Sequence, residues 1–316
     1  MIDLSIVVVG RDAVDLLMDC FRSIQETIRY HTYDVHYIDN GSEEPCVERT
    51  RREYPNVQVT DAGQNLGFTR ANNIGIWNSS GRYCLALNND TRLTPGALDG
   101  LIEWMDQNPE VGVVGCRLRR QNESIQNSIH TFPTLATELL NRGLLKLLFP
   151  RRFHAKPTDV VDPIEVDAVL GAFMLVRREV IDEVGAFDDD YFIFLEETDW
   201  CWRIKNAGWK IVYHPGFFIY HIQGAYVKRF PGRMKAEFYR SRYLYFLKHR
   251  GHLVRALLMG GLCVRLVISI LLGLIGVVAT LGCASGIRER FQVSCVLLAW
   301  HFLGCPKSWG LSESGE

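Results

Sequence analysis

The chain has 316 residues, of which 47% are hydrophobic and 22% charged, and its formal net charge is −1. This composition is typical of a chain that folds around a core, and the balanced charge gives no support to nucleic-acid binding. Nine cysteines occur without a C-x-x-C pair, which argues against a disulfide framework or zinc site and favours a reducing, cytosolic setting. No signal peptide is expected, because Asp3 stands where a basic segment belongs.

Apolar segments with strand character alternate with segments of helical periodicity along the first two thirds of the chain. Strands are predicted at 4–9, 34–38, 57–59 and 83–87, and helices at 14–30, 48–54 and 69–78. Farther along, helices are predicted at 95–108, 178–184 and 196–207, and strands at 111–114, 166–176, 211–213 and 217–220. Residues 119–163 read as an irregular insertion. The alternation predicts a mostly parallel sheet built from βαβ units.

The composition changes beyond about residue 225. Basic residues crowd the stretch from Lys228 to Arg255, and residues 257–284 are then apolar apart from Arg265. A second apolar stretch covers 291–305. A membrane-spanning helix needs about 20 apolar residues, and anionic lipid attracts basic segments. We therefore expect two domains, 1–225 and 226–316, the second contacting a membrane; a buried helical pair is the alternative.

The apolar segment 85–87 stops abruptly at Asn88, Asn89 and Asp90. In open α/β sheets, ligands bind beyond the carboxyl ends of strands. A carboxylate there can hold a divalent cation that bridges a nucleotide diphosphate. The alternative is a polar turn.

Two further segments offer contacts to a nucleotide. Asp39 ends the second predicted strand, where it can accept a hydrogen bond from the imide N–H of a uracil or thymine ring, or else form an Asx-turn. Gly67 allows close backbone approach, the following helix presents free N–H groups to an anion, and Arg70 can face a phosphate. The alternative is an ordinary capped helix.

An acidic cluster and a histidine complete the candidate residues. Glu196, Glu197 and Asp199 lie within four residues in an aromatic setting. Like-charge neighbours and burial raise a carboxyl pKa and can make the group a competent base, whereas the alternative is a helix N-terminus that favours acids. His221 follows an apolar run and suits a divalent cation shared with Asp90, although a lone histidine is more often structural.

In this order and spacing the segments resemble the family 2 glycosyltransferases, in the branch that holds rhamnosyl- and galactofuranosyl-type enzymes. The resemblance covers about residues 4–225. It rests on the motifs Asp39-Asn40-Gly41-Ser42, Asn65-x-Gly67-Phe68 to Asn73-x-Gly75, Leu87 to Thr91, Gly171 to Arg178, Val184 to Asp188, Glu196-Glu197-x-Asp199, and Gly208-Trp209 before His221.

The resemblance implies an α/β protein of the GT-A fold, a Rossmann-like, mostly parallel sheet flanked by helices, with a C-terminal helical, membrane-associating segment. It implies Glu197 as catalytic base, supported by Glu196 and Asp199, and Asp90 and His221 as ligands of Mg²⁺ or Mn²⁺. The nucleotide-sugar site is expected to include Val9, Asp39, Asn65, Gly67, Arg70, Asn73, Asn88, Asn89, Gly171 and Ala172. Asn88 departs from the family's D-x-D acid, and Glu197 from its usual aspartate.

The expected activity is that of an inverting hexosyltransferase. Its donor would be a dTDP- or UDP-linked sugar, rhamnose-like first, and its acceptor a glycan or lipid-linked glycan of a bacterial surface polysaccharide. The expected location is the cytoplasmic face of the bacterial inner membrane, with no nucleic-acid partner. The alternatives are a retaining transferase or nucleotidyltransferase on the same fold, and a non-catalytic partner in polysaccharide assembly.

Overall fold

The computed structural model describes residues 2–141, 143, 145, 147, 160–222, 231–281 and 283–311. These residues group into two compact units. Unit 1 takes Met1–Phe132, His154–Phe192 and Glu196–Ala225, and unit 2 takes Pro133–Phe153, Ile193–Leu195 and Tyr226–Glu316. Within the predicted insertion at 119–163, residues 142, 144, 146 and 148–159 lie outside the described residues, as do Lys228 and Arg229 of the basic segment.

Unit 1 is built on a mixed sheet with the strand order β3-β2-β1-β4-β10-β6-β11-β5, in which β8 also pairs with β11. Its strands are β1 (Leu4–Gly10), β2 (Tyr33–Asp39), β3 (Gln58–Asp61), β4 (Tyr83–Asn88), β5 (Thr91–Arg92), β6 (Val111–Arg119), β8 (Ile164–Glu165), β10 (Phe173–Arg177) and β11 (Lys210–His221). The pairs among β3, β2, β1 and β4 are parallel, as is β6 with β11. Strand β10 runs antiparallel between β4 and β6. The expected mostly parallel, Rossmann-like arrangement is confirmed.

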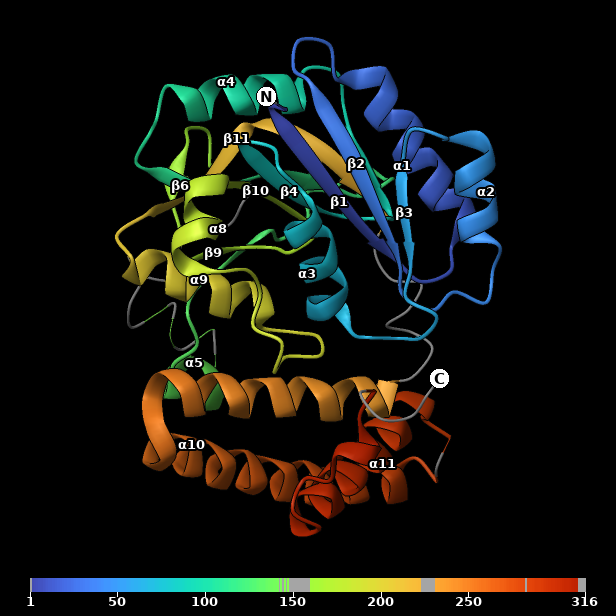
Figure 1. Cartoon of the computed structure of the whole chain (residues 1–316). Coiled ribbons are helices and arrows are strands. Elements are labelled where there is room, and N and C mark those ends of the chain that lie inside the picture. Colours follow the sequence, from blue (N-terminus) through green and yellow to red (C-terminus); the bar gives the residue numbers. More distant parts are fainter. Residues whose placement is uncertain are drawn as a thin grey trace. The chain divides into compact units, whose positions relative to one another are not determined.

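Helices cover both faces of this sheet (Figure 1). They are α1 (Val14–Thr27), α2 (Cys46–Glu53), α3 (Phe68–Asn78), α4 (Ala97–Asp106), α8 (Arg178–Val184) and α9 (Glu196–Asn206). One apolar core joins the sheet to α1 and α4, and a second joins it to α3, α8 and α9. Strand β1 contributes side chains to both cores, because Val8 points into the first core and Val7 into the second. Burial on both faces explains the continuous apolar run of this strand.

The structure corrects two strand predictions. Residues 166–176 do not form one strand: β9 (Ala168–Val169) pairs with β7 (Ile129–His130), and β10 begins only at Phe173. Between them the N–H of Phe173 donates to the carbonyl of Leu170, so the chain turns at Gly171. Conversely, the predicted strands 211–213 and 217–220 are one strand, β11, with a register shift between His214 and Phe218. Pro215 lies in this irregularity, where its missing N–H does no harm.

Unit 2 is helical. It contains α5 (Leu135–Leu139), α10 (Pro231–Ala279), α11 (Ser285–Phe302) and the short 3₁₀ helix η1 (Lys307–Trp309). Helix α10 is two helices joined at Gly251, whose φ of 82° reverses the ribbon (Figure 1). We call them the basic half (231–250) and the apolar half (252–279). A Cβ on Gly273 would lie 3.1 Å from Phe291, so small residues let the apolar half approach α11 closely.

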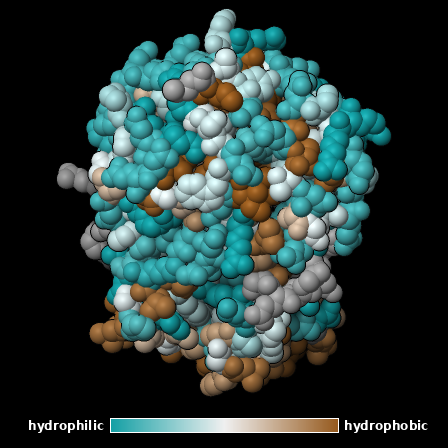
Figure 2. Space-filling view, in the orientation of Figure 1, coloured by the Kyte–Doolittle hydropathy of each residue, from teal (hydrophilic) through white to brown (hydrophobic). Residues whose placement is uncertain are grey.

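The apolar half of α10 leaves many large side chains exposed. Among the described residues, one helix, Gly232–Ala279, is long and apolar enough to cross a membrane, and little of its apolar window is buried. The exposed side chains include Leu257, Val264, Ile268, Leu271, Leu272, Ile275 and Val278. Apolar residues accordingly gather over the unit 2 helices in the space-filling view (Figure 2). A contiguous patch of this kind marks an interaction surface.

Candidate functional site

The carboxyl ends of three strands bring several of the predicted site residues to one edge of the sheet. In the β1–β4 register Val9 stands opposite Asn88, and in the β1–β2 register Gly10 stands opposite Asp39. The N–H of Asn88 donates to the carbonyl of Ala172 at 3.2 Å, which adds the turn before β10 to this edge. The parallel pairing explains this convergence, since parallel strands end on the same side.

Asn89 lies directly over β1. A Cβ on Gly10 would come within 2.7 Å of Asn89 Nδ2, so a larger residue there would displace the Asn89 amide. The same Nδ2 donates to the carbonyl of Asp12 at 3.3 Å. This amide therefore connects the loop after β1 to the end of β4.

Asp39 forms an Asx-turn, the alternative that the sequence offered beside a hydrogen bond to a pyrimidine ring. Its carboxylate is buried and accepts from Tyr37 Oη at 2.7 Å, from Ser42 N at 3.0 Å and from Ser42 Oγ at 2.5 Å. Gly41 has a φ of 79° in this turn, a value that glycine adopts readily because it has no Cβ. Two carboxylate oxygens offer about four acceptor positions, so these three donors leave about one for a further hydrogen bond.

Gly67 begins α3 with a φ of 84°. A Cβ there would lie 2.6 Å from the ring of Phe192, and the N–H of Phe68 donates to the carbonyl of Phe192 at 2.7 Å. Asn65 Oδ1 accepts from the N–H of Gly67 at 3.1 Å and so shapes the same turn. Arg70, in the first turn of α3, is exposed.

Asn73 makes its hydrogen bonds with the loop between α8 and α9. Its Nδ2 donates to the carbonyl of Phe187 and to Asp189 Oδ1, both at 2.8 Å, and its Oδ1 accepts from the N–H of Phe187 at 3.0 Å. The side chain is buried and holds the loop between α8 and α9. The structure therefore assigns Asn73 a packing role.

The first turn of α9 carries two carboxyl groups without visible compensation. Among the described residues, the Oε2 atoms of Glu196 and Glu197 are buried and have no hydrogen-bond partner. Burial raises the pKa of Glu197 from 4.5 to about 7. Burial, followed by repulsion from Glu197, raises the pKa of Glu196 well above its ordinary value. A Cβ on Gly171 would lie 3.6 Å from the Cβ of Glu197, which places Glu197 beside the turn that contains Gly171 and Ala172.

The third acid of this helix is fully engaged. Asp199 is buried and accepts from Arg203 Nε at 2.9 Å, and the same guanidinium donates to the carbonyls of Val184 and Ala186. Asp199 thus holds Arg203 as a strut for the loop after α8. Paired and unpaired acids within one helical turn have different chemistry. Glu196 and Glu197, each with an unpartnered Oε2, are the two that can accept a proton, and Glu197 is the one that lies beside Gly171.

Strained backbone leads into this helix. Phe194 and Leu195 have φ values of 72° and 64°, a region that residues other than glycine rarely adopt. In unit 2 this segment is held by Ser241 Oγ, which donates to the carbonyl of Ile193 at 2.7 Å, and by the edge-to-face contact of Phe194 with Phe238. Such strain persists where the surroundings impose it and is concentrated at functional sites.

Asp90 and His221 meet, although 130 positions separate them. Strand β5 pairs with the end of β11, with His221 opposite Thr91, and this register sets His221 Nε2 3.3 Å from Asp90 Oδ1. His221 Nδ1 lies 3.0 Å from Gln126 Oε1, and this hydrogen bond orients the imidazole so that Nε2 faces the carboxylate.

This pair fits a divalent cation. Asp90 Oδ1 is buried without a hydrogen-bond partner in the described part of the chain, and two adjacent ligands of a cation lie about 3 Å apart. A histidine oriented by a hydrogen bond through its other nitrogen is the usual arrangement of a metal ligand. No group of three or more His, Cys, Asp or Glu is found among the described residues, so the remaining ligands would come from substrate and water.

Sequence reasoning missed Gln126 and Phe192. Gln126 is buried and orients His221, yet it lies in the stretch that reads as an irregular insertion, and one glutamine gives no local signal. Phe192 contacts Gly67 across the chain, and only the glycine hinted at a close approach.

Comparison with known proteins identifies the family of the chain. The family model described as Glycosyl transferase family 2 matches residues 5–185. An N-acetylglucosaminyl-diphospho-decaprenol L-rhamnosyltransferase of Mycobacterium tuberculosis is 28% identical over 231 residues, which cover 67% of this chain and 74% of that protein. Rhamnosyltransferase WbbL of Escherichia coli is 25% identical over 229 residues, covering 67% and 83%.

Solved structures show the same fold. GalNAc-T7, crystallised with UDP, GalNAc and Mn²⁺, superposes with a TM-score of 0.55 at 16% identity and covers 72% of this chain. TarS of S. aureus superposes with a TM-score of 0.54 at 12% identity and covers 78%. The matches cover 44% and 39% of those two chains, so this chain spans less than half of each. With its GT-A fold and its rhamnosyltransferase homologues, the chain belongs to glycosyl transferase family 2 and is a hexosyltransferase.

Proposed function

We propose that this protein is an inverting glycosyltransferase that moves a rhamnose-like sugar from a dTDP- or UDP-linked donor to a glycan or lipid-linked acceptor in bacterial surface polysaccharide synthesis. The printed names of the M. tuberculosis and E. coli relatives support the choice of sugar, and the first of them supports a lipid-diphosphate acceptor. The observation that carries the proposal is the half-buried Glu197, whose Oε2 is buried without a partner among the described residues and which lies beside Gly171.

Glu197 has the properties of a general base. With a pKa raised to about 7, it is substantially ionised near neutral pH and still basic enough to take a proton. In the proposed step it removes the proton from the acceptor hydroxyl while that oxygen forms a bond to the anomeric carbon of the donor. The bond from this carbon to the diphosphate oxygen breaks at the same time, and its electron pair leaves with the nucleoside diphosphate.

The donor would lie along the edge formed by Val9, Asn88 and Ala172. The acceptor position left open on Asp39 suits the imide N–H of a pyrimidine. The exposed Arg70, in the first turn of α3, suits the negative charge of the phosphates. Gly171 and Ala172 would contact the sugar near Glu197.

Asp90 and His221 would hold Mg²⁺ or Mn²⁺, with Gln126 fixing the imidazole. When bound, such a cation neutralises charge on a departing diphosphate and orients it. Asn89 and Asn88 would contribute neutral oxygen and N–H groups at the same strand end.

Unit 2 would dock on the cytoplasmic face of the inner membrane. The exposed leucine, isoleucine and valine side chains of the apolar half would be buried in the lipid. The arginines of the basic half of α10 would be attracted to anionic lipid. The apolar part of α11, residues 291–302, is about 18 Å long at 1.5 Å per residue. This falls short of the roughly 30 Å hydrocarbon core, so we favour insertion into one leaflet.

A donor panel tests the activity. Full-length protein is incubated with dTDP- and UDP-sugars, Mn²⁺ or Mg²⁺ and a lipid-diphosphate glycan, and the anomeric configuration of the product is read by NMR. We expect transfer with inversion, fastest from a dTDP-deoxyhexose. Retained configuration, formation of a nucleotide–sugar bond, or the absence of transfer from every donor would each refute the proposal.

The membrane interaction has its own test. Leu272→Glu places a charge on an exposed position of the apolar half and leaves the core intact. We expect this variant to float less with vesicles while keeping its thermal midpoint. Trp77→Glu, at an exposed apolar position of unit 1, serves as the matched control and should float normally.

A further inference from the structure

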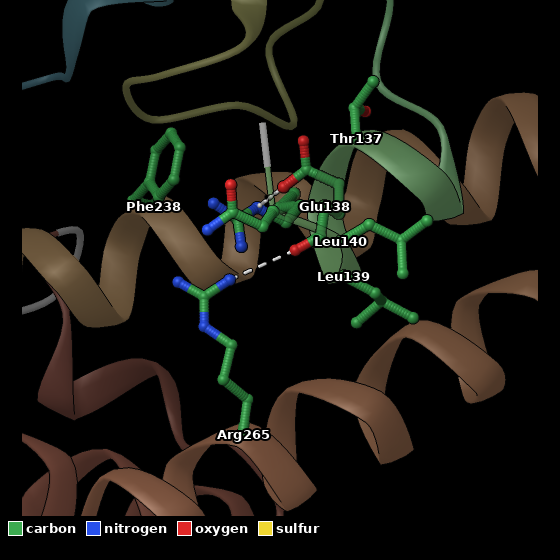
Figure 3. Close-up of a pocket in the computed structure, with 8 residues that line it drawn as sticks. Thr137, Glu138, Leu139, Leu140, Phe238 and Arg265 are labelled. Carbon is green, nitrogen blue, oxygen red and sulfur yellow. Dashed lines mark hydrogen bonds and ion pairs between the residues drawn. The ribbon is translucent and has the colours of Figure 1, made fainter. Parts of the chain in front are cut away.

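Unit 2 contains a cavity of about 580 Å³ that the proposed transfer reaction does not use. Its lining comes from α5 and the following residues and from both halves of α10 (Figure 3). The lining residues are Thr137, Glu138, Leu139, Leu140, Asn141, Phe238, Arg242 and Arg265. The cavity therefore has two arginines and one acid, and a net positive charge.

Glu138 connects the two arginines. Its carboxylate pairs with Arg242 Nε at 2.9 Å, and both side chains are largely buried, at 14% and 12% exposure. Its backbone carbonyl accepts from Arg265 Nη1 at 3.2 Å, as the dashed line to Arg265 in Figure 3 shows. Within the described residues Arg265 has no carboxylate partner, so no described acid neutralises its charge.

Arg265 is an isolated charge within the apolar half of α10. It is the single charged residue between Ala256 and Ile287, and the side chains of Val264 and Ile268 beside it are exposed. An arginine at the edge of an apolar, lipid-facing surface costs free energy unless it is paired, and such residues usually mark a binding site. Here its guanidinium turns toward the cavity.

We propose that this cavity binds the anionic phosphate headgroup of a membrane lipid, with Arg265 as the principal contact and Arg242 as the second. This inference rests on the membrane docking proposed above. A guanidinium matches a phosphate through paired N–H donors. Lipid chains can lie along the exposed apolar half of α10 while the headgroup enters the cavity. A soluble anion lacks the chains for the first contact, and a neutral lipid lacks the net negative charge for the second.

The walls are built to keep this shape. A Cβ on Gly261 would lie 2.7 Å from Leu139, so α5 is seated directly on the apolar half one turn before Arg265. The Phe238 ring lies against the guanidinium carbon of Arg242 at 4.4 Å and limits its movement. Both arginines are thus presented to the cavity by packed helices.

Vesicle binding tests the inference on the full-length protein. Three vesicle types are compared: phosphatidylcholine alone, phosphatidylcholine with phosphatidylglycerol, and phosphatidylcholine with a prenyl diphosphate. We expect Arg265→Gln to lose about tenfold or more in partitioning to one or both anionic vesicle types and to be unchanged on zwitterionic phosphatidylcholine. Arg265→Lys, which keeps the charge without the planar fork, should lose less. The vesicle type with the larger loss identifies the lipid.

Arg255→Gln is the matched control, because Arg255 lies on the same helix but outside the cavity lining. One surface charge contributes about fivefold to binding, or about 1 kcal/mol. If Arg265→Gln loses no more than this control, or loses equally on phosphatidylcholine, the inference is wrong. Circular dichroism and the thermal midpoint show whether each variant is folded.

Glu138→Gln gives a second test with the opposite sign. It removes the anion that competes for Arg242, so binding to anionic lipid should rise up to about fivefold. A fall in a folded variant would contradict the inference.

These experiments distinguish failure of the lipid site from failure of the proposed function. Wild-type protein that binds no vesicles would refute the docking itself, whereas vesicle binding without an Arg265 effect would refute the lipid site alone. Glu197→Gln should slow transfer by about 10²- to 10⁴-fold and leave every vesicle result unchanged.

Discussion

Replacing Glu197 with glutamine keeps the size of the side chain and removes its ability to accept a proton. A positioned general base contributes about 10²- to 10⁴-fold to rate, and we expect kcat to fall by this factor while donor binding is kept. Because burial raises the pKa to about 7, kcat/KM of the wild type should increase with pH up to about 7 and then level off. The residual activity of the variant should lack this inflection.

The same group affects stability in a defined direction. Its folded pKa of about 7 exceeds the ordinary value of 4.5, so the folded state holds the proton more tightly. This contribution is fully present below pH 4.5 and is lost as the pH rises through about 7. The difference between the two values corresponds to about 3 kcal/mol. Glu197→Gln should therefore be more stable than the wild type at about pH 8, by up to this amount, and similar to it at about pH 4.

Initial rates across pH, together with urea unfolding at both pH values, measure these effects. Glu179→Gln is the matched control, since it makes the same change in the first turn of α8 at an exposed position. The control should leave activity and stability unchanged. Near wild-type turnover by Glu197→Gln, or equal stability of variant and wild type at about pH 8, would refute the role of a buried, unpaired base.

Three further substitutions probe the surroundings of the site. Gln126→Ala removes the acceptor that orients the proposed histidine ligand and should weaken Mn²⁺-dependent UDP or dTDP binding about 10- to 100-fold in calorimetry; unchanged affinity would contradict this role. Arg203→Ala leaves the buried Asp199 without its cation and should cost about 3–5 kcal/mol in urea unfolding, with less than about 1 kcal/mol counting against the strut. Gly67→Ala should lower the thermal midpoint more than Gly63→Ala, because both positions have positive φ but open space surrounds only Gly63. Equal losses would show that the contact is unimportant.

Local pattern was sufficient for most elements of unit 1. The alternation of apolar and amphipathic segments placed β1, β4 and α3 within one residue of their observed ends. Prediction failed where an apolar run conceals a turn, as at Gly171, and where a strand continues across Pro215. Periodicity records which side chains are buried, and burial alone does not say where a hydrogen-bonded ladder stops.

The sequence alone determined the family and the chemical types of the site residues, because the order and spacing of motifs such as Asn88 to Asp90 and Glu196 to Asp199 are written along the chain. Only the tertiary structure decided which of these groups are available. Asn73 is hydrogen-bonded to a loop and Asp199 is paired with Arg203, whereas Oε2 of Glu197 has no partner in the described part of the chain. The reason is physical: reactivity depends on the partners and the solvent around a group, and these come from residues that are distant in sequence.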